Sequence, residues 1–216
     1  MKIVIFGALG RAGRHIVQEA LKRGHDVIGV SRQPTTQREE SIPRLQLVRG
    51  DATQTETVAQ LVAGADAVVN SISPRPSAGG PACSLEDAAR ALIQGLRTAG
   101  VKRLLVVGGA GSLEVAPGIP LKSMPDFPTE YLPEATAQGK ALELYRNEAV
   151  DLDWTYLSPA IIFDGDKRTG HYRITGDSLL TDADGISTIS FADYAVATLD
   201  ELERPQHLKQ RFGVAY

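Results

Sequence analysis

The sequence predicts an α/β fold in which a doubly wound parallel sheet carries helices on both faces. Three observations predict it. Short runs rich in β-branched residues alternate with helical patterns from the first residues onward. The runs hold few polar residues, as expected for strands buried on both faces. A glycine-rich turn joins the first run to the first helical pattern. Right-handed crossovers leave the doubly wound arrangement as the default topology for such a series.

Seven strands and five helices are expected, and they alternate except where the second strand is followed directly by the third. The strands are predicted at residues 2–7, 26–32, 45–51, 65–72, 103–109, 153–159 and 211–216. The helices are predicted at residues 12–24, 53–64, 84–100, 129–148 and 189–203. Three of these helices carry capping pairs at their starts, namely Thr53 with Glu56, Ser84 with Asp87, and Ser190 with Asp193. Glycines that end helices stand at Gly24, Gly64 and Gly100.

Three segments break the alternation. Residues 73–83, which follow the fourth strand, and residues 113–128, which follow the fifth, are irregular and rich in proline and glycine. Both follow the carboxyl ends of strands, where open α/β sheets bind ligands. Residues 169–187 are rich in glycine and aspartate and predict turns and short strands.

Composition limits the class of protein. The chain has 216 residues, of which 43% are hydrophobic and 23% charged, so we expect a single domain over residues 1–216, with residues 160–190 as a small substrate-side segment. A net charge of −3 without a basic run predicts no nucleic-acid partner. The lone Cys83 excludes an internal disulfide and fits a reducing compartment. No run approaches the ~18 apolar residues of a membrane span, so we expect a cytoplasmic monomer or homodimer without a membrane partner.

The glycine-rich turn is the strongest sign of a ligand. Gly7, Gly10 and Gly13 lie between the first strand and the first helix, with the spacing Gly-x-x-Gly-x-x-Gly. The start of a helix presents free N–H groups and a partial positive charge, which suit a pyrophosphate. Gly7 would permit the tight turn, Gly10 the approach of phosphate, and Gly13 the close packing of helix on strand. The alternative is a closely packed turn that binds nothing.

The second and third strands bear on the choice of coenzyme. Proteins that read NAD often place a carboxylate near the end of the second strand, but this chain has Arg32 there, and Arg11 lies within the glycine turn. Two guanidiniums suit a 2′-phosphate, so NADP(H) is favoured while NAD(H) remains possible; the alternative is that both are solvated. Asp51, before Ala52, could accept a hydrogen bond from adenine or cap a turn.

The chain resembles the atypical short-chain dehydrogenase/reductase proteins, and within them the NAD(P)H-binding, NmrA-like group that includes bacterial NADH-flavin reductase-like proteins. The resemblance covers nearly the whole chain and rests on "GALGRAG", "GDATQTETV", "VVGGAGSLEVAPG", "DWTYLSPA", "RTGHYRITGDSLLTDADGISTISFADYAVATLDELE" and "RFGVAY". The glycine motif is common to many families, whereas the serine-containing block and the long aspartate-containing block are far more specific.

The resemblance implies a Rossmann-like fold and a set of site residues. Gly7, Gly10, Arg11, Ala12 and Gly13 would bind the pyrophosphate, and Arg32 would lie by the adenosine ribose. Asp51 and Ala52 would flank the adenine, and Asn70, Ser71 and Ile72 would line the nicotinamide ribose. Ser112 falls where the superfamily carries its active-site serine, and Pro159 would lie beside the carboxamide. No metal site is expected, because the histidines have no ligand spacing.

The chain departs from the superfamily in its proton donor. The usual acid is a tyrosine followed four residues later by lysine, but Tyr131 and Tyr145 are followed there by Ala135 and Ala149. Alcohol dehydrogenation therefore lacks its usual agent. Reduction of a planar conjugated acceptor, with FMN, FAD or a quinone as substrate, does not need that tyrosine, because solvent can supply the proton. Ser112 could bind the acceptor's carbonyl or simply cap its loop. A non-catalytic NADP(H)-binding sensor of NmrA type is the second hypothesis.

Overall fold

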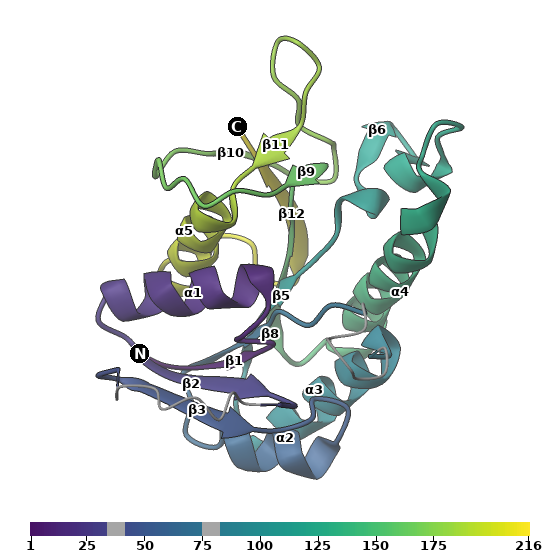
Figure 1. The fold of residues 1–216 in the computed structure, drawn as a ribbon. Coiled ribbons are helices and arrows are strands. Elements are labelled where there is room, and N and C mark those ends of the chain that lie inside the picture. Colours follow the sequence, from purple (N-terminus) through teal and green to yellow (C-terminus); the bar gives the residue numbers. More distant parts are fainter. Residues whose placement is uncertain (34–41, 75–82) are drawn as a thin grey trace.

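The computed structural model describes residues 1–33, 42–74 and 83–216. Its centre is an eight-stranded sheet, and one strand at its edge is antiparallel (Figure 1). Across the sheet the strands are β10 (Arg173–Thr175), β12 (Gln210–Ala215), β8 (Asp153–Ser158), β5 (Arg103–Val107), β4 (Ala67–Asn70), β1 (Lys2–Phe6), β2 (Asp26–Ser31) and β3 (Leu45–Arg49). The predicted doubly wound α/β fold is confirmed, with β10 as an addition that pairs antiparallel with β12.

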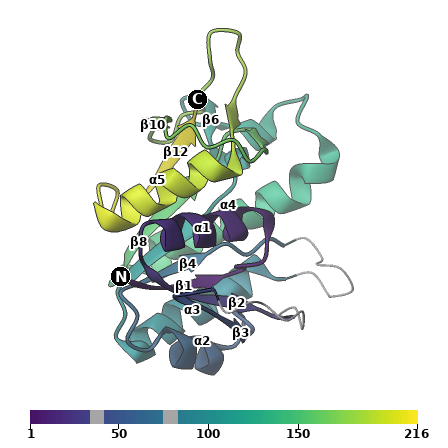
Figure 2. The same cartoon turned by 60° about the vertical axis from the view of Figure 1, so that its left-hand side comes forward.

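Helices cover both faces of this sheet, as Figures 1 and 2 show. On one face lie α1 (Arg11–Lys22) and α5 (Phe191–Glu203), and on the other α2 (Thr55–Val62), α3 (Leu85–Ala99) and α4 (Leu132–Glu148). Each face has its own apolar core. Side chains of successive strand residues alternate between the two, so that Val68 packs with α3 while Val69 packs with α1 and α5.

Local signals account for most helix ends. Ser84 Oγ accepts a hydrogen bond from the Asp87 amide at 3.1 Å, and Ser190 Oγ accepts one from the Asp193 amide at 3.0 Å, as predicted. Gly100 ends α3 in the left-handed conformation, with φ of 72°. The capping pair expected at Thr53 is wrong. The N-cap of α2 is Gln54, and the Thr53 hydroxyl instead donates to Asp51 Oδ1 at 2.8 Å, because the preceding turn competes for it.

Two small sheets lie outside the central one. β6 (Glu114–Ala116) pairs antiparallel with β7 (Ile119–Pro120) in the segment after β5. β9 (Ile162–Phe163) pairs in parallel with β11 (Thr188–Ile189) in the segment after β8. Both of these segments leave the carboxyl ends of sheet strands. The third irregular segment, expected after β4, lies mostly at residues 75–82, outside the described residues.

The order of the strands creates a switch point. From β1 the chain builds β2 and β3 on one side, then returns to place β4 on the other side of β1, followed by β5, β8 and β12. The segments that follow β1 and β4 therefore leave in opposite directions at the carboxyl edge, which is where doubly wound sheets form a ligand crevice. Among the described residues, no helix is both long and apolar enough to cross a bilayer.

Candidate functional site

The turn between β1 and α1 is built so tightly that only glycine fits at two of its positions. Gly7 has φ of +77°, and a Cβ there would stand 2.4 Å from the carbonyl oxygen of Ser71. A Cβ on Gly13 would stand 2.1 Å from the carbonyl oxygen of Gly7. The first contact joins the turn to the end of β4, and the second seats α1 directly on the turn. The backbone of the turn therefore lies at the switch point.

The start of α1 has free hydrogen-bond donors. Gly10 is its N-cap, so no side chain can cap the helix from that position, and the first turn contains no acidic residue. The amides of Arg11, Ala12 and Gly13 have no acceptor within the helix, because the first N–H groups of any α-helix lack one. Among the described residues, no side chain accepts a hydrogen bond from these amides. This fits a bound anion such as a pyrophosphate, and the close backbone contacts around Gly7 and Gly13 keep side chains out of its way.

Arg11, the first residue of α1, turns toward α5. Its guanidinium carbon lies 5.4 Å from the centre of the Phe191 ring, a cation–π contact, and the His15 ring stacks on the same phenylalanine at 5.7 Å. Phe191 is the first residue of α5, after the capping Ser190. The contact directs the exposed Arg11 side chain toward the start of α5.

The neighbouring strands β2 and β3 are each followed by a charged residue. Arg32 follows β2 and is half-buried, and Asp51 follows β3. Burial raises the pKa of the Cys83 thiol, while the positive charge of Arg32 opposes that shift and the negative charge of Asp51 adds to it. Asp51 Oδ1 accepts hydrogen bonds from the amide and the hydroxyl of Thr53, at 3.0 and 2.8 Å. Asp51 thus caps a turn, as one of its two sequence interpretations predicted, and Ala52 beside it is buried.

The end of β4 is tied to α4. Asn70 is buried; its Nδ2 donates to the Tyr145 hydroxyl at 3.2 Å, and its Oδ1 accepts from the Ile72 amide at 3.2 Å. Burial raises the pKa of Tyr145, so that hydroxyl remains protonated. Ser71, between the two, donates its amide to Phe6 at 2.9 Å and presents its carbonyl to Gly7. The three residues expected at the nicotinamide ribose therefore form one rigid turn beside the glycines.

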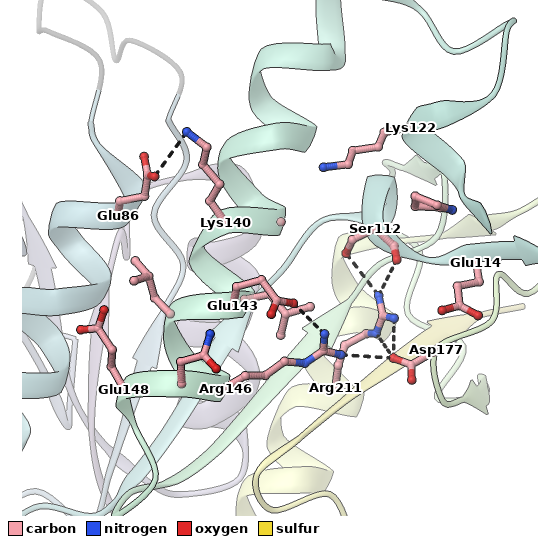
Figure 3. A pocket seen from close by; sticks show the side chains of 15 residues that line it. Glu86, Ser112, Glu114, Lys122, Lys140, Glu143, Arg146, Glu148, Asp177 and Arg211 are labelled. Atoms are coloured by element: carbon pink, nitrogen blue, oxygen red, sulfur yellow. Dashed lines mark hydrogen bonds and ion pairs between the residues drawn. The ribbon is translucent and has the colours of Figure 1, made fainter. Parts of the chain in front are cut away.

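Ser112 lies in a short 3-10 helix, Ala110–Ser112, that follows β5. Arg211 Nη1 donates to the Ser112 carbonyl at 2.9 Å and to its hydroxyl oxygen at 3.2 Å, and Arg211 Nε donates to Asp177 at 2.6 Å (Figure 3). Ser112 lines a cavity of about 670 Å³ along α4, whose lining includes no residue of the glycine turn. The structure therefore does not join Ser112 and the turn in this one cavity.

The end of β8 contains a group that sequence reasoning missed. Ser158, the last residue of β8, is fully buried, and its Oγ has no hydrogen-bond partner among the described residues. It stands immediately before the predicted Pro159, which is also buried. A buried hydroxyl without a partner is uncommon and suits a polar ligand group or a water. Its only sequence signal was its position beside Pro159 at the carboxyl end of a strand.

Residues 160–190 are fastened over α1 and α5 by buried carboxylates. Asp193 accepts from the Thr169 amide at 2.9 Å, the Gly170 amide at 2.7 Å and the Tyr216 hydroxyl at 2.6 Å. Burial by itself would raise the pKa of Asp193, but the bonds from Tyr216, Thr169 and Gly170 outweigh it and lower that pKa. Glu19 on α1 similarly pairs with Arg168 at 2.9 Å. This segment is therefore held in one position relative to the sheet.

The predicted positions thus fall into two groups. The residues of the glycine turn, Arg32, Asp51, Ala52, the β4 turn and Pro159 all follow the carboxyl ends of parallel strands, which meet at one edge of the sheet. Ser112 follows such a strand too, but its side chain is engaged from β12. The described residues contain no group of three or more His, Cys, Asp or Glu side chains that could hold a metal.

A family model described as NAD(P)H-binding matches residues 7–202. A curated relative, the uncharacterized protein YwnB of Bacillus subtilis (strain 168), is 44% identical over 218 residues, covering 99% of this chain and 98% of its own.

Two solved structures have the same fold over the whole chain. One, from Burkholderia pseudomallei and described as a proposed exported protein, is 38% identical with a TM-score of 0.88, covering 100% of both chains. The other, from Streptococcus pneumoniae TIGR4 and described as a proposed NADH-flavin reductase, is 35% identical with a TM-score of 0.83, covering 100% of this chain and 99% of its own.

Proposed function

Because this chain belongs to the NAD(P)H-binding family, we propose that it is an NAD(P)H-dependent oxidoreductase that reduces a planar conjugated acceptor such as a flavin or a quinone. The observation that carries the proposal is the uncapped glycine turn. Its first-turn amides have no side-chain acceptor among the described residues, and its backbone is packed too closely for any Cβ at Gly7 or Gly13. Such a turn at a switch point suits the diphosphate of a dinucleotide.

The coenzyme would be held along the carboxyl edge of the sheet. Gly7, Gly10, Arg11, Ala12 and Gly13 would bind the pyrophosphate, Arg32 the adenosine ribose, Asp51 and Ala52 the adenine, Asn70, Ser71 and Ile72 the nicotinamide ribose, and Pro159 the carboxamide side. The lone hydroxyl of Ser158 supports a polar group at that end. When bound, the reduced nicotinamide supplies a hydride. The role of this chain's residues is to hold the two reactants in contact.

NADP(H) is the favoured coenzyme, with NAD(H) as a possible second. Arg32 carries this preference, because a guanidinium at the end of the second strand suits a 2′-phosphate and would not serve the ribose hydroxyl as a carboxylate does. Arg11 adds a positive charge at the first residue of α1, and its contact with Phe191 turns the side chain toward α5.

The acceptor class follows from the missing proton donor. The sequence has no tyrosine four residues before a lysine on α4, so protonation of an alkoxide has no evident agent. A conjugated ring spreads the added charge and takes its proton from water. In this proposal the Ser112 hydroxyl donates a hydrogen bond to a carbonyl of the substrate that is reduced. Arg211 can only donate to its oxygen, which leaves the Ser112 proton free to point at a substrate.

A second candidate is a sensor that binds NADP(H) without turning it over. The same missing tyrosine and lysine favour it, together with the engagement of Ser112 by Arg211, which gives that serine a structural role. The two candidates share the coenzyme site and differ in chemistry.

One assay separates the candidates. Oxidation of NADPH is followed at 340 nm with FMN, FAD and a soluble quinone in turn, and binding of NADPH is measured in parallel by calorimetry. Steady oxidation with any acceptor supports the reductase. Binding without oxidation supports the sensor, and absence of heat with both NADPH and NADH contradicts both.

Location and assembly are part of the proposal. We expect a cytoplasmic monomer or homodimer, with a small molecule as its partner and neither nucleic acid nor membrane. The single cysteine supports a reducing compartment. Cell fractionation and light scattering would test both expectations, and recovery in an exported fraction would contradict the first.

A further inference from the structure

Lys122 projects into the cavity that Ser112 lines. This cavity of about 670 Å³ lies between α4 and the segment that follows β5, and Figure 3 shows the Lys122 amine pointing across it toward α4. The side chain is half-buried. Its ammonium is therefore partly removed from water, so its attraction to a nearby negative charge is stronger than at an open surface.

Among the described residues, no carboxylate pairs with this amine, although five carboxylates line the same cavity, those of Glu86, Glu114, Glu143, Glu148 and Asp177. The other cations that line the cavity each have a carboxylate: Lys140 pairs with Glu86 at 3.5 Å, Arg146 with Glu143 at 2.7 Å, and Arg211 with Asp177. Among the described residues, no carboxylate lies within 4 Å of the Lys122 amine. Of the cations that line this cavity, Lys122 is the one that forms no ion pair with a described residue.

The local fold keeps the amine where it is. Lys122 lies in a short 3-10 helix, Leu121–Ser123, that is anchored when the Leu121 amide donates to the Leu113 carbonyl at 2.7 Å. The amine nitrogen rests over Gly139 of α4, and a Cβ at that position would stand 3.3 Å from it. Because Gly139 has no side chain, the amine reaches the cavity without steric conflict.

We propose that Lys122 binds an anionic group, a phosphate or carboxylate, carried by the acceptor whose ring lies beside Ser112. This rests on the proposed reductase function and adds a substrate class to it. A charge-assisted hydrogen bond from a partly desolvated ammonium is stronger than a neutral one, so the site selects acceptors with an anionic arm over neutral ones with the same ring.

FMN and riboflavin are the matched probes, because they share one ring system and differ by a phosphate. Binding of each oxidised flavin is measured by quenching of its fluorescence, with NADP⁺ present and no reductant. We expect Lys122→Met to weaken FMN binding about tenfold, the effect of losing one charged hydrogen bond, and to change riboflavin binding less than twofold. Lys122→Arg restores FMN binding.

Lys140→Met is the matched control. It removes another cation that lines the same cavity, but the charge of Lys140 is already neutralised by Glu86. We expect it to change FMN binding less than twofold, and thermal melts establish that each variant is folded. Equal affinity of the wild type for FMN and riboflavin, equal weakening of both by Lys122→Met, or no binding of FMN would each overturn the inference. Oxidation of NADPH is a separate readout. If FMN binding depends on Lys122 but NADPH is not oxidised, the reductase proposal is contradicted and the anion subsite is supported. If NADPH is oxidised but FMN binding does not depend on Lys122, the reductase proposal is supported and the anion subsite is contradicted.

Discussion

Arg211 donates hydrogen bonds to both the carbonyl and the hydroxyl oxygen of Ser112, at 2.9 and 3.2 Å, although 99 residues separate the two. The contact fixes the orientation of the Ser112 side chain from β12, which lies two strands away from β5 in the sheet. It also occupies the hydroxyl oxygen as an acceptor, so the hydroxyl proton is left to donate elsewhere.

Ser112→Ala tests whether that proton serves the acceptor. Removing a donor to the developing charge of the acceptor should lower kcat/KM for the acceptor about tenfold or more and leave the Kd of NADPH unchanged. Arg211→Met, which frees the serine to rotate, should lower kcat/KM as well. If Ser112→Ala retains full turnover in the assay at 340 nm, the serine only caps its loop.

Gly13→Ala tests the glycine turn. The added methyl would lie 2.1 Å from the Gly7 carbonyl oxygen, so α1 must move off the turn that its amides are proposed to serve. We expect NADPH binding in calorimetry to weaken by at least about tenfold, with a loss of stability of about 1–3 kcal/mol from overpacking.

The control for Gly13→Ala is Gly95→Ala, on α3. A Cβ there would stand 2.5 Å from the Val58 side chain, far along the chain from the turn. It should cost a similar amount of stability by urea unfolding while leaving the Kd of NADPH within twofold of the wild type. Equal losses of affinity in the two variants would show that general destabilisation, and not the turn, governs binding.

Arg32→Ala tests the choice of coenzyme. Losing a guanidinium that contacts a 2′-phosphate should weaken NADPH about tenfold and leave NADH unchanged, since NADH has no such phosphate. Arg49→Ala removes an equal charge from the end of the neighbouring strand β3 and should change both affinities less than twofold. A parallel loss of NADPH and NADH affinity in Arg32→Ala would count against the proposed contact.

Asp193 predicts a particular response to acid. Hydrogen bonds hold its pKa below the ordinary value of 3.8 in the folded protein, so the carboxylate stabilises the fold above about pH 4, and that contribution disappears as pH falls through the lowered pKa. Asp193→Asn should reduce the free energy of unfolding by about 2 kcal/mol at pH 7. The difference from the wild type should shrink in urea titrations near pH 3.

Asp166→Asn is the comparison for that experiment. Asp166 belongs to the same segment, but its side chain is 72% exposed, and its one ion pair with a described residue is to His15. Exposed pairs contribute about 0–1 kcal/mol, so this variant should stay close to the wild type at both pH values. A difference between Asp193→Asn and the wild type that is the same at pH 3 and pH 7 would contradict the assigned carboxylate role.

The sequence predicted the fold nearly completely because its signals are local. Strand runs, the serine caps at Ser84 and Ser190 and the glycine at position 100 act within a few residues, and each was found where expected. The one failed cap, at Thr53, failed because α2 has Gln54 as its N-cap, one residue later, while the Thr53 hydroxyl donates to Asp51 in the preceding turn. The antiparallel edge strand β10 was expected only as one of several short strands, because three residues carry too little periodicity to specify a partner.

For the candidate site, the sequence predicted where residues lie along the edge of the sheet but not which side chains they contact. That Gly7, Asn70 and Pro159 share one edge followed from the parallel alternation of strands, since carboxyl ends of parallel strands meet. Three relations did not follow: Arg11 lies over Phe191, Asn70 donates to Tyr145, and the buried Ser158 hydroxyl has no partner in the described part of the chain. Those contacts join elements that are distant in the sequence, so no local sequence pattern predicts them.

By itself, then, the sequence determined a doubly wound sheet with a glycine turn at its switch point, since these depend on backbone preferences read over short windows. Only the tertiary structure decided that Ser112 accepts hydrogen bonds from Arg211, and that the Lys122 amine lies beside Gly139 without an ion pair to any described residue. The physical reason is that side-chain partnership depends on strand order and helix packing, which bring together residues from β12, α4 and the loop after β5 that are neighbours only in the folded chain.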